Sequence, residues 1–229
     1  MDKEWVTQAT RIHRRWNAYC CIVQNFESKI SLNRQYLDEC IQQTTAIKHD
    51  QTTTVSKIAI DRTDLVLKRY NARSFGHKIK RSLRQSRAQR CWNMSYVFAQ
   101  AGLNVAAPIF MFEERFLFFR QHAYFANEYL SGSELLSLLP NMNDAEKMQV
   151  VDAFEHAMNI MQEHKISHGD LKASNLLWVD SQLYFIDLDA ARQHKTIASW
   201  QRANIRDKKR FLKNWRETPE LEALFAWIK

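Results

Sequence analysis

The chain has 229 residues, of which 45% are hydrophobic, and it carries a formal net charge of +8. This length suits one large domain or two small lobes, and the apolar content predicts a folded globular protein with a buried core. With only 4 Gly and 3 Pro, and with no low-complexity linker or fixed-period repeat, we do not expect separate tethered domains. None of the four cysteines has Cys-x-x-Cys spacing, so we expect reduced thiols at Cys20, Cys21, Cys40 and Cys91.

The first fifty residues are the least regular part of the pattern. Met1 to Trp5 contains charges where a secretory signal would have its apolar stretch, and no apolar run approaches the roughly 20 residues of a membrane span. The sequence therefore predicts a cytoplasmic protein. We expect a helical extension followed by a first strand, with apolar positions at Trp5, Trp16, Tyr19, Phe26, Tyr36 and Leu37.

Two β-rich segments come next, at 52–60 and 65–70, around the turn 61–64. They predict a hairpin with Lys68 in its second strand. A basic, helix-compatible stretch runs from about Ser82 to Ala101 and ends at Gly102, where a helix favours a C-terminal glycine. Two aromatic-rich strands are expected at about 109–112 and 116–129.

The chain becomes helical beyond Gly132. Asn143 and Glu146 have the spacing of a capping box, and the helix that they begin is expected to end just before His168. Its apolar residues recur at three- and four-residue steps, at Met148, Val151, Phe154, Met158 and Met161. About forty helix-like residues follow Asp187, so the C-terminal helical region is expected to be short.

The segment from His168 to Asn175 carries the clearest chemical signal. Asp170 can accept the proton of an attacking hydroxyl, while Asn175 and Asp187 can share the Mg²⁺ that bridges nucleotide phosphates. A strand, turn and strand between Asn175 and Asp187 would bring both to the same end of a hairpin, as a shared metal requires. The pattern therefore predicts a phosphotransfer site.

Three other segments fit a nucleotide-dependent enzyme. Lys68, in an apolar strand ahead of a helix, is a candidate ligand of nucleotide phosphates. Lys172 can balance charge on the transferring phosphoryl group. An adenine ring can bond the backbone of Glu128 and Leu130, in a hinge between two lobes. His168 is expected to brace the loop by hydrogen bonding rather than to do chemistry.

Over Thr52 to Ala191 the chain resembles the protein-kinase-like superfamily and, within it, the bacterial lipopolysaccharide kinases that phosphorylate heptose or Kdo sugars of the inner core. The resemblance implies an α+β, two-lobed fold with a β-rich N-lobe, 1–130 including the N-terminal extension, and a short helical C-lobe, 131–229. It implies ATP as donor, Asp170 as base with Lys172 beside it, and Mg²⁺ on Asn175 and Asp187. The segments that carry it are 67–70, 86–88 with Trp92, 101–108, 128–132, 168–175 and 186–192.

Two features depart from the protein-kinase pattern. No glycine occurs between Ala46 and Leu67, so phosphate cover must come from other backbone amides or from side chains such as Thr52 to Thr54. No Asp or Glu occurs from Arg69 to Phe112, so Lys68 lacks the usual helix glutamate. Gln85, Gln89 or a carboxylate from elsewhere would have to replace it.

Three functions stay open at this point. The first is an ATP-dependent kinase of a lipopolysaccharide core sugar or lipid-linked acceptor, in peripheral contact with the anionic inner face of the inner membrane. The second is an atypical protein kinase or ATPase of the RIO or Bud32 type. The third is a non-enzymatic module that holds anionic lipid or nucleic acid with the basic runs 78–84 and 202–213. These runs contain few aromatics, so no nucleic-acid partner is expected.

Overall fold

The computed structural model describes residues 10–30, 32–44, 46–49, 52–71, 85–116 and 119–228. The chain forms two compact units, Met1–Asn93 with Ala107–Tyr129, and Met94–Ala106 with Leu130–Lys229. The assignment of 1–130 and 131–229 as functional lobes stays a prediction. The basic run 78–84, with the predicted helix start at Ser82, and Trp5 lie outside the described residues.

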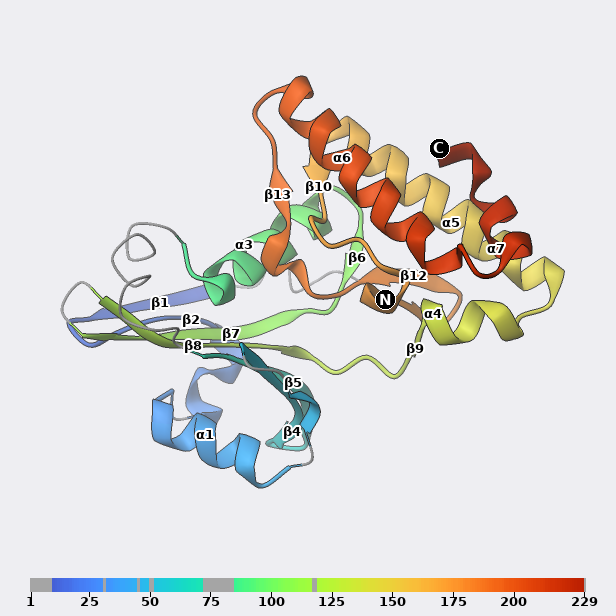
Figure 1. Ribbon diagram of the computed structural model, residues 1–229. Coiled ribbons are helices and arrows are strands. Elements are labelled where there is room, and N and C mark those ends of the chain that lie inside the picture. Colours follow the sequence, from blue (N-terminus) through green and yellow to red (C-terminus); the bar gives the residue numbers. More distant parts are fainter. Residues whose placement is uncertain are drawn as a thin grey trace. The chain divides into compact units, whose positions relative to one another are not determined.

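The first unit is built on a seven-stranded sheet with the order β1-β2-β7-β8-β5-β4-β3 (Figure 1). Every neighbouring pair of strands is antiparallel. The strands are β1 (Thr10–Arg15), β2 (Ala18–Val23), β3 (Ala46–His49), β4 (Thr53–Ile60), β5 (Thr63–Tyr70), β7 (Pro108–Phe116) and β8 (Phe119–Glu128).

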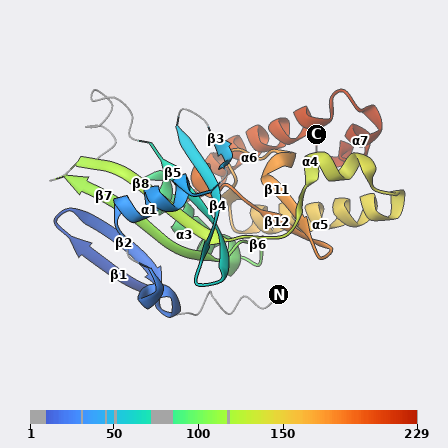
Figure 2. The ribbon, with the colours of Figure 1, turned by 90° about the horizontal axis from the view of Figure 1, so that it is seen from below.

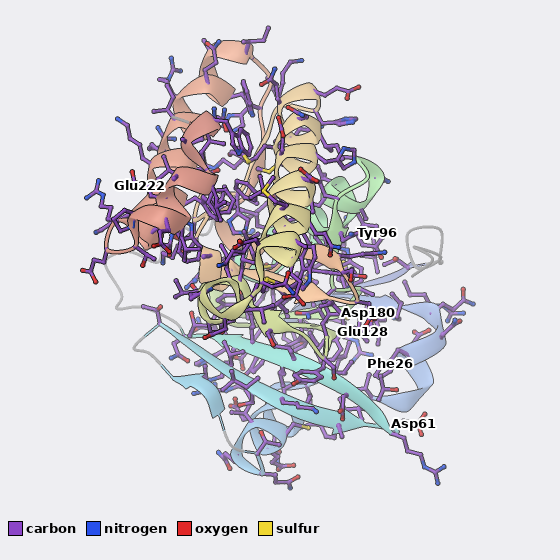
Figure 3. All side chains as sticks on the ribbon, turned by 90° about the vertical axis from the view of Figure 1, so that its right-hand side faces the viewer. Phe26, Asp61, Tyr96, Glu128, Asp180 and Glu222 are labelled. Atoms are coloured by element: carbon purple, nitrogen blue, oxygen red, sulfur yellow. The ribbon has the colours of Figure 1, made fainter. Side chains whose placement is uncertain are left out.

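The predicted hairpin of β4 and β5 is confirmed, and it carries Lys68 opposite Val55 and Phe125. The two turn residues, Asp61 and Arg62, have φ of 48° and 62°. Two consecutive residues with positive φ are typical of the tight turns whose twist matches that of antiparallel strands. Figure 3 shows Asp61 at the tip of this hairpin.

The expectation of a helical extension with a single strand was wrong for the described part of the first fifty residues. This region forms the hairpin β1–β2, a 3₁₀ helix η2 (Gln24–Lys29), helix α1 (Arg34–Gln42) and β3. The reason is tertiary: β2 pairs with β7, which lies about ninety residues further along the chain. The turn of the β1–β2 hairpin also gives no clear signal in the sequence. Trp16 and Asn17 connect the two strands, and no glycine marks the turn.

Helices lie on both faces of the first unit's sheet. On one face, Asp38 of α1 accepts hydrogen bonds from Tyr124 Oη at 2.8 Å and Arg69 Nη1 at 3.1 Å. Burial alone would raise the pKa of the Asp38 carboxyl, but these hydrogen bonds lower it overall. On the opposite face, Tyr70 contacts Cys91 of helix α3 (Arg87–Gln100), with Oη and Sγ 3.2 Å apart.

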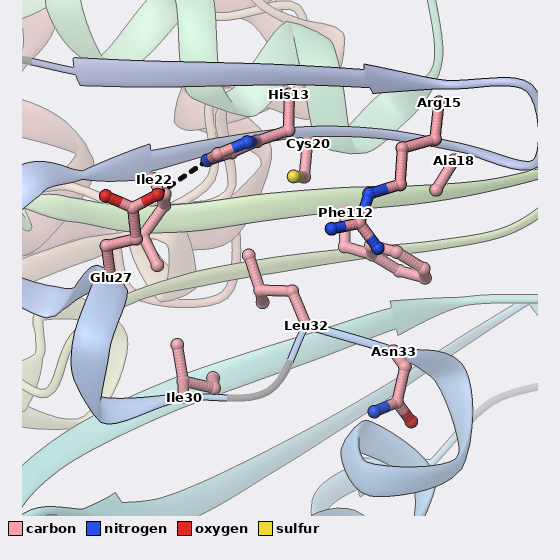
Figure 4. A pocket seen from close by; sticks show the side chains of 10 residues that line it. All are labelled: His13, Arg15, Ala18, Cys20, Ile22, Glu27, Ile30, Leu32, Asn33 and Phe112. Atoms are coloured by element: carbon pink, nitrogen blue, oxygen red, sulfur yellow. Dashed lines mark hydrogen bonds and ion pairs between the residues drawn. The ribbon is translucent and has the colours of Figure 1, made fainter.

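A cavity of about 350 Å³ lies in the first unit, beside the β1–β2 hairpin (Figure 4). His13, Arg15 and Glu27 contribute its charged walls, and His13 Nε2 lies 2.7 Å from Glu27 Oε1. Asn33 and mostly apolar side chains, Ile22 and Phe112 among them, complete the lining. These contacts place His13 and Arg15 on the cavity face of β1, because alternate residues of a strand share a face.

The second unit combines helices with a four-stranded sheet of order β6-β12-β11-β9 and the strand pair β10–β13 (Figure 2). The strands are β6 (Asn104–Val105), β9 (Ser133–Glu134), β10 (Ile166–Ser167), β11 (Leu176–Val179), β12 (Gln182–Phe185) and β13 (Arg192–Gln193). The helices are α4 (Leu135–Leu138), α5 (Asp144–Glu163), α6 (Ile197–Leu212) and α7 (Pro219–Leu224). Short 3₁₀ helices are η4 (Leu139–Asn141), η5 (Ala173–Asn175), η6 (Leu188–Ala190), η7 (Lys213–Trp215) and η8 (Ala226–Ile228).

Two helix-end predictions in this unit are confirmed. Asn143 and Glu146 form a reciprocal capping box, with both hydrogen bonds at 2.9 Å. Gly102, just beyond α3, has φ of 101°, a conformation that a side chain would strain. Helix α5 nevertheless ends at Glu163, earlier than expected, because β10 occupies the residues before His168.

The second unit has an aromatic core between α5 and α6, which lie side by side in Figure 1. The Phe154 and Phe211 rings stack with centroids 4.3 Å apart, and Phe225 packs edge-on against both. Such pairs stabilise by about 0.5–1.5 kcal/mol beyond their burial. None of the helices described here is long and apolar enough to span a bilayer.

Candidate active site

The catalytic-loop segment runs from β10 through η5 into the hairpin β11–β12. The expected strand, turn and strand are confirmed: Leu176 pairs with Phe185, and Ile186 N donates to Asn175 O at 3.0 Å. Asp187 follows directly, so it lies at the same end of the hairpin as Asn175. This unit therefore brings together four predicted residues, Asp170, Lys172, Asn175 and Asp187.

Two cations hold the Asp170 carboxylate. Lys172 Nζ lies 3.1 Å from Oδ2, and Arg210 Nη1 forms an ion pair with Oδ1. Arg210 Nη1 also donates to Gly169 O at 3.1 Å. The Asp170 side chain is 26% exposed, so a hydroxyl group of an acceptor can reach it. Its charge and position suit a general base.

Asp207, on helix α6, fixes the backbone of the same loop. Its Oδ2 accepts hydrogen bonds from His168 N at 2.8 Å and Gly169 N at 3.0 Å. The residue is only 2% exposed, so both hydrogen bonds are made to a buried carboxylate. Charged acceptors strengthen such bonds, and the two together set the direction in which the loop leaves β10.

His168 is fully buried and braces the loop, as its position predicts. Its Nε2 lies 3.0 Å from Ile186 O, and because a carbonyl can only accept, Nε2 carries the proton. Nδ1 then accepts a long hydrogen bond of 3.4 Å from Asp170 N. Burial lowers the pKa of His168 from 6.5, despite the opposing charges of Asp207, Asp187 and Asp170. The imidazole is therefore neutral at pH 7. Its two hydrogen bonds link Asp170 N in the catalytic loop to Ile186 O at the end of the β11–β12 hairpin.

The lowered pKa of His168 predicts a loss of stability in acid. Above pH 6.5 the imidazole is neutral in both folded and unfolded chains, so it adds no pH dependence. Below pH 6.5 the unfolded chain binds a proton that the folded chain resists, so the free energy of unfolding falls by up to about 1.4 kcal/mol per pH unit. Urea denaturation at pH 7.5 and 5.5 measures this.

The matched comparison is His168→Gln, which keeps a donor for Ile186 O but does not titrate. Burial lowers the pKa of His122 and His194 as well, so both proteins will lose some stability in acid. We expect the wild type to lose more than the variant. Equal losses of stability in the wild type and in His168→Gln would contradict the assignment of this pH dependence to His168.

Gly169 is required where the loop passes Ala190. It has φ of 79°, and a Cβ atom built on it would lie 2.4 Å from Ala190 O. No side chain fits there without moving backbone atoms, in addition to the strain of a positive φ. The small residue thus allows the catalytic loop and η6, the short helix after Asp187, to approach closely.

Asn175 and Asp187 have the chemistry of a Mg²⁺ site. The Asn175 amide donates to Asp170 O at 2.8 Å through Nδ2, which leaves Oδ1 as an oxygen ligand. Asp187 has φ of 61°, an uncommon conformation for a non-glycine residue that is often found at functional sites. One amide and one carboxylate oxygen suit an ion that keeps water and phosphate ligands. The described residues contain no cluster of three or more His, Cys, Asp and Glu that could hold a metal by themselves.

The predicted nucleotide-binding residues fall in both units. Lys68 and Glu128 belong to the first unit, and Leu130 to the second. Lys68 is half-buried on the sheet face that it shares with Tyr70, the face that contacts α3. In the proposed hinge, Glu128 N donates to Ala107 O at 2.9 Å, and burial raises the pKa of the Glu128 carboxyl. The roles of Lys68, Glu128 and Leu130 stay predictions.

Sequence reasoning missed Asp207 and Arg210. Both lie in the basic run 202–213, which reads as a solvated helix face. One signal was available: Asp207 shares the apolar stripe of α6, and it is buried like the stripe's other members. The stripe consists of Trp200, Ala203, Asp207 and Phe211. An acidic residue on an apolar stripe predicts a buried hydrogen-bonding role.

Comparisons with known proteins bear on the family and the fold of this chain. The family described as "Lipopolysaccharide kinase (Kdo/WaaP) family" matches residues 40–224. The solved structure "WaaP in complex with acyl carrier protein" has a TM-score of 0.59 at 17% identity, covering 91% of this chain and 95% of that one. This similarity confirms the predicted α+β kinase-like fold.

A local match joins the chain to "KEOPS complex subunit Bud32" of Pyrococcus abyssi (strain GE5 / Orsay). The two are 33% identical over 70 residues, which is 31% of this chain and 32% of the relative. The match thus spans about a third of that relative's length. It agrees with a protein-kinase-like fold.

Proposed function

Because the chain belongs to the lipopolysaccharide kinase (Kdo/WaaP) family, we propose that it transfers a phosphoryl group from ATP to a hydroxyl of an inner-core sugar, heptose or Kdo. Membership confirms the family resemblance and the kinase class predicted from the sequence. The observation that carries the proposal is the grouping of Asp170, Lys172 and Asn175 on a loop braced by His168 and Asp207.

In the proposed reaction, Asp170 orients the acceptor hydroxyl and receives its proton as the oxygen attacks the γ-phosphorus. The bond between the γ-phosphorus and the bridging oxygen breaks, and ADP leaves with that oxygen. Lys172 balances the negative charge of the transferring group. Asn175 and Asp187 would hold Mg²⁺, which supplies charge neutralisation to the nucleotide phosphates. Lys68 would contact those phosphates, and the backbone of Glu128 and Leu130 would receive the adenine.

The reaction can be tested with purified protein. Core oligosaccharide from a strain that lacks the enzyme is incubated with ATP and Mg²⁺ and then analysed by mass spectrometry. We expect the mass of one phosphate group to be gained, on a sugar hydroxyl. No gain with folded, ATP-binding protein would contradict the assignment of the acceptor.

A protein acceptor is the second candidate, and the local match to Bud32 favours it. The same site chemistry serves a serine or threonine hydroxyl, because Asp170 needs only an alcohol within reach. Phosphorylation of a protein partner, with none of the oligosaccharide, would select this alternative.

We propose that the enzyme acts at the cytoplasmic face of the inner membrane, in peripheral contact with anionic lipid. The β1–β2 hairpin supports this contact. Trp16, at its turn, is 76% exposed, and Ile12 on β1 is 55% exposed. Arg14 is exposed and lies on the same face of β1 as Ile12. Tryptophan partitions to the membrane interface, and each basic residue near an anionic bilayer contributes about 1 kcal/mol.

The hairpin contact can be measured by sedimentation with vesicles that contain phosphatidylglycerol. We expect the double variant Ile12→Ser, Trp16→Ser to bind at least about tenfold more weakly than wild type, because two interfacial side chains are lost. Met148→Ser, which removes a similarly exposed apolar side chain from α5, should bind like wild type. Equal binding by wild type and the double variant would contradict the contact.

A further inference from the structure

Arg210 stands outside the kinase motif yet touches its central residue. It lies one helical turn beyond Asp207, whose carboxylate fixes the backbone of His168 and Gly169. Because Asp207 ties α6 to the loop, the Arg210 backbone is held beside Asp170. The guanidinium then contacts both the Asp170 carboxylate and Gly169 O. Its position is therefore set by the same helix that sets the loop.

The Asp170 carboxylate faces two cations, Lys172 at Oδ2 and Arg210 at Oδ1. Lys172 is accounted for by the transferring phosphoryl group, whereas the kinase chemistry described above assigns nothing to Arg210. Asp207 and Asp187 also carry negative charge near this loop, so charge balance alone does not explain Arg210. Its position distinguishes it, because the guanidinium lies beside the carboxylate that would receive the acceptor's proton.

Arg210 also retains binding capacity. Within the described part of the chain, its side-chain contacts run through Nη1, and the side chain is 46% exposed. A guanidinium carries five N–H donors in a planar fork that matches carboxylate and phosphate oxygens. Donors at Nε and Nη2 can therefore engage an anion while Nη1 keeps its hold on the loop.

We propose that Arg210 binds an anionic substituent of the acceptor, a sugar carboxylate or phosphate, next to the hydroxyl that Asp170 activates. This inference rests on the proposed function and narrows its acceptor to an acidic or already phosphorylated sugar. The bound anion accepts hydrogen bonds from Nε and Nη2 of Arg210 and aligns the hydroxyl with Asp170. A neutral sugar offers these donors no charged acceptor and is discriminated against.

The test compares acceptors as well as variants. Native core oligosaccharide is measured beside the same oligosaccharide with its carboxylates reduced to alcohols, and beside one with its phosphates removed. For wild type, loss of the recognised anion should lower kcat/KM by about 10- to 100-fold, the size of a charge-assisted hydrogen bond. The arm that shows the loss identifies carboxylate or phosphate as the ligand.

Arg210→Gln should lower kcat/KM on native oligosaccharide by a similar factor. The kcat/KM of this variant should then fall little further when the neutralised acceptor replaces the native one. Arg210→Lys should restore part of the discrimination. The KM for ATP should stay unchanged in both. Arg202→Gln, an exposed arginine on the same helix, should behave as wild type. Equal losses on all acceptors, or a raised KM for ATP, would overturn the proposal.

Calorimetric titration of the oligosaccharides separates this inference from the reaction itself. If wild type binds native oligosaccharide more tightly than the neutralised form, and Arg210→Gln does not, the anion site stands even without turnover. If wild type binds both forms equally, the anion site is refuted whatever the activity. Denaturation curves of Arg210→Gln check that the variant is folded.

Discussion

Asp170→Asn is expected to reduce the rate of phosphoryl transfer by about 10²- to 10⁴-fold, the usual contribution of a general base. The amide cannot take up the hydroxyl proton, and it leaves the charges of Lys172 and Arg210 unpaired. The affinity for Mg²⁺-ATP should change little, because the proposed nucleotide contacts lie at Lys68, Asn175 and Asp187. Single-turnover kinetics and calorimetric ATP binding measure the two effects separately.

Asp180→Asn is the matched control for that substitution. Asp180 lies in the β11–β12 turn, labelled in Figure 3, and is exposed. Its φ of 47° is one that asparagine also tolerates. This variant should transfer phosphate at the wild-type rate. If Asp170→Asn kept wild-type kcat on a phosphate-accepting oligosaccharide, Asp170 would not be the base.

Asp207→Ala is expected to lower the free energy of unfolding by about 2–5 kcal/mol. It removes the acceptor for His168 N and Gly169 N, and leaving a buried N–H group without its acceptor is costly. Transfer activity should fall as well, because the loop that carries Asp170 loses its anchor. Urea denaturation and transfer rates measure the two losses.

Asp207→Asn keeps an acceptor oxygen and should lose only part of this stability, since it forfeits only the charge assistance. Asp152→Ala, an exposed acidic residue on α5, should be nearly neutral. Wild-type stability in Asp207→Ala would show that the two hydrogen bonds do not hold the loop.

The sequence alone predicted those elements whose structure depends on residues close together in the chain. The hairpin with Lys68, the capping box of Asn143 and Glu146, and the pairing that follows Asn175 each depend on residues close in the chain. Short-range turn chemistry and alternation therefore specify them. The catalytic-loop motif belongs to this class, because Asn175 ends the short 3₁₀ helix η5, which begins three residues after Asp170.

Long-range contacts were not predictable in this way. Asp207 and Arg210 approach the loop because α6 packs against α5 through Phe211 and Phe154 and is bonded to β10 through Trp200. The strand β2 exists as part of a sheet because β7 lies beside it. In both cases the deciding partner is distant in the sequence, and nothing in the local pattern names it. The run 202–213 is mostly basic, so its one acidic residue, Asp207, was not recognised as buried.

The central claim is that this chain phosphorylates a lipopolysaccharide core sugar with Asp170 as base. The most direct measurement is mass spectrometry of core lipopolysaccharide from a deletion strain that carries the wild-type gene, the Asp170→Asn gene or neither. We expect one phosphate group to be missing in the deletion strain, to return with the wild-type gene and to stay missing with Asp170→Asn. Core sugar that keeps all its phosphate in the deletion strain would contradict the claim.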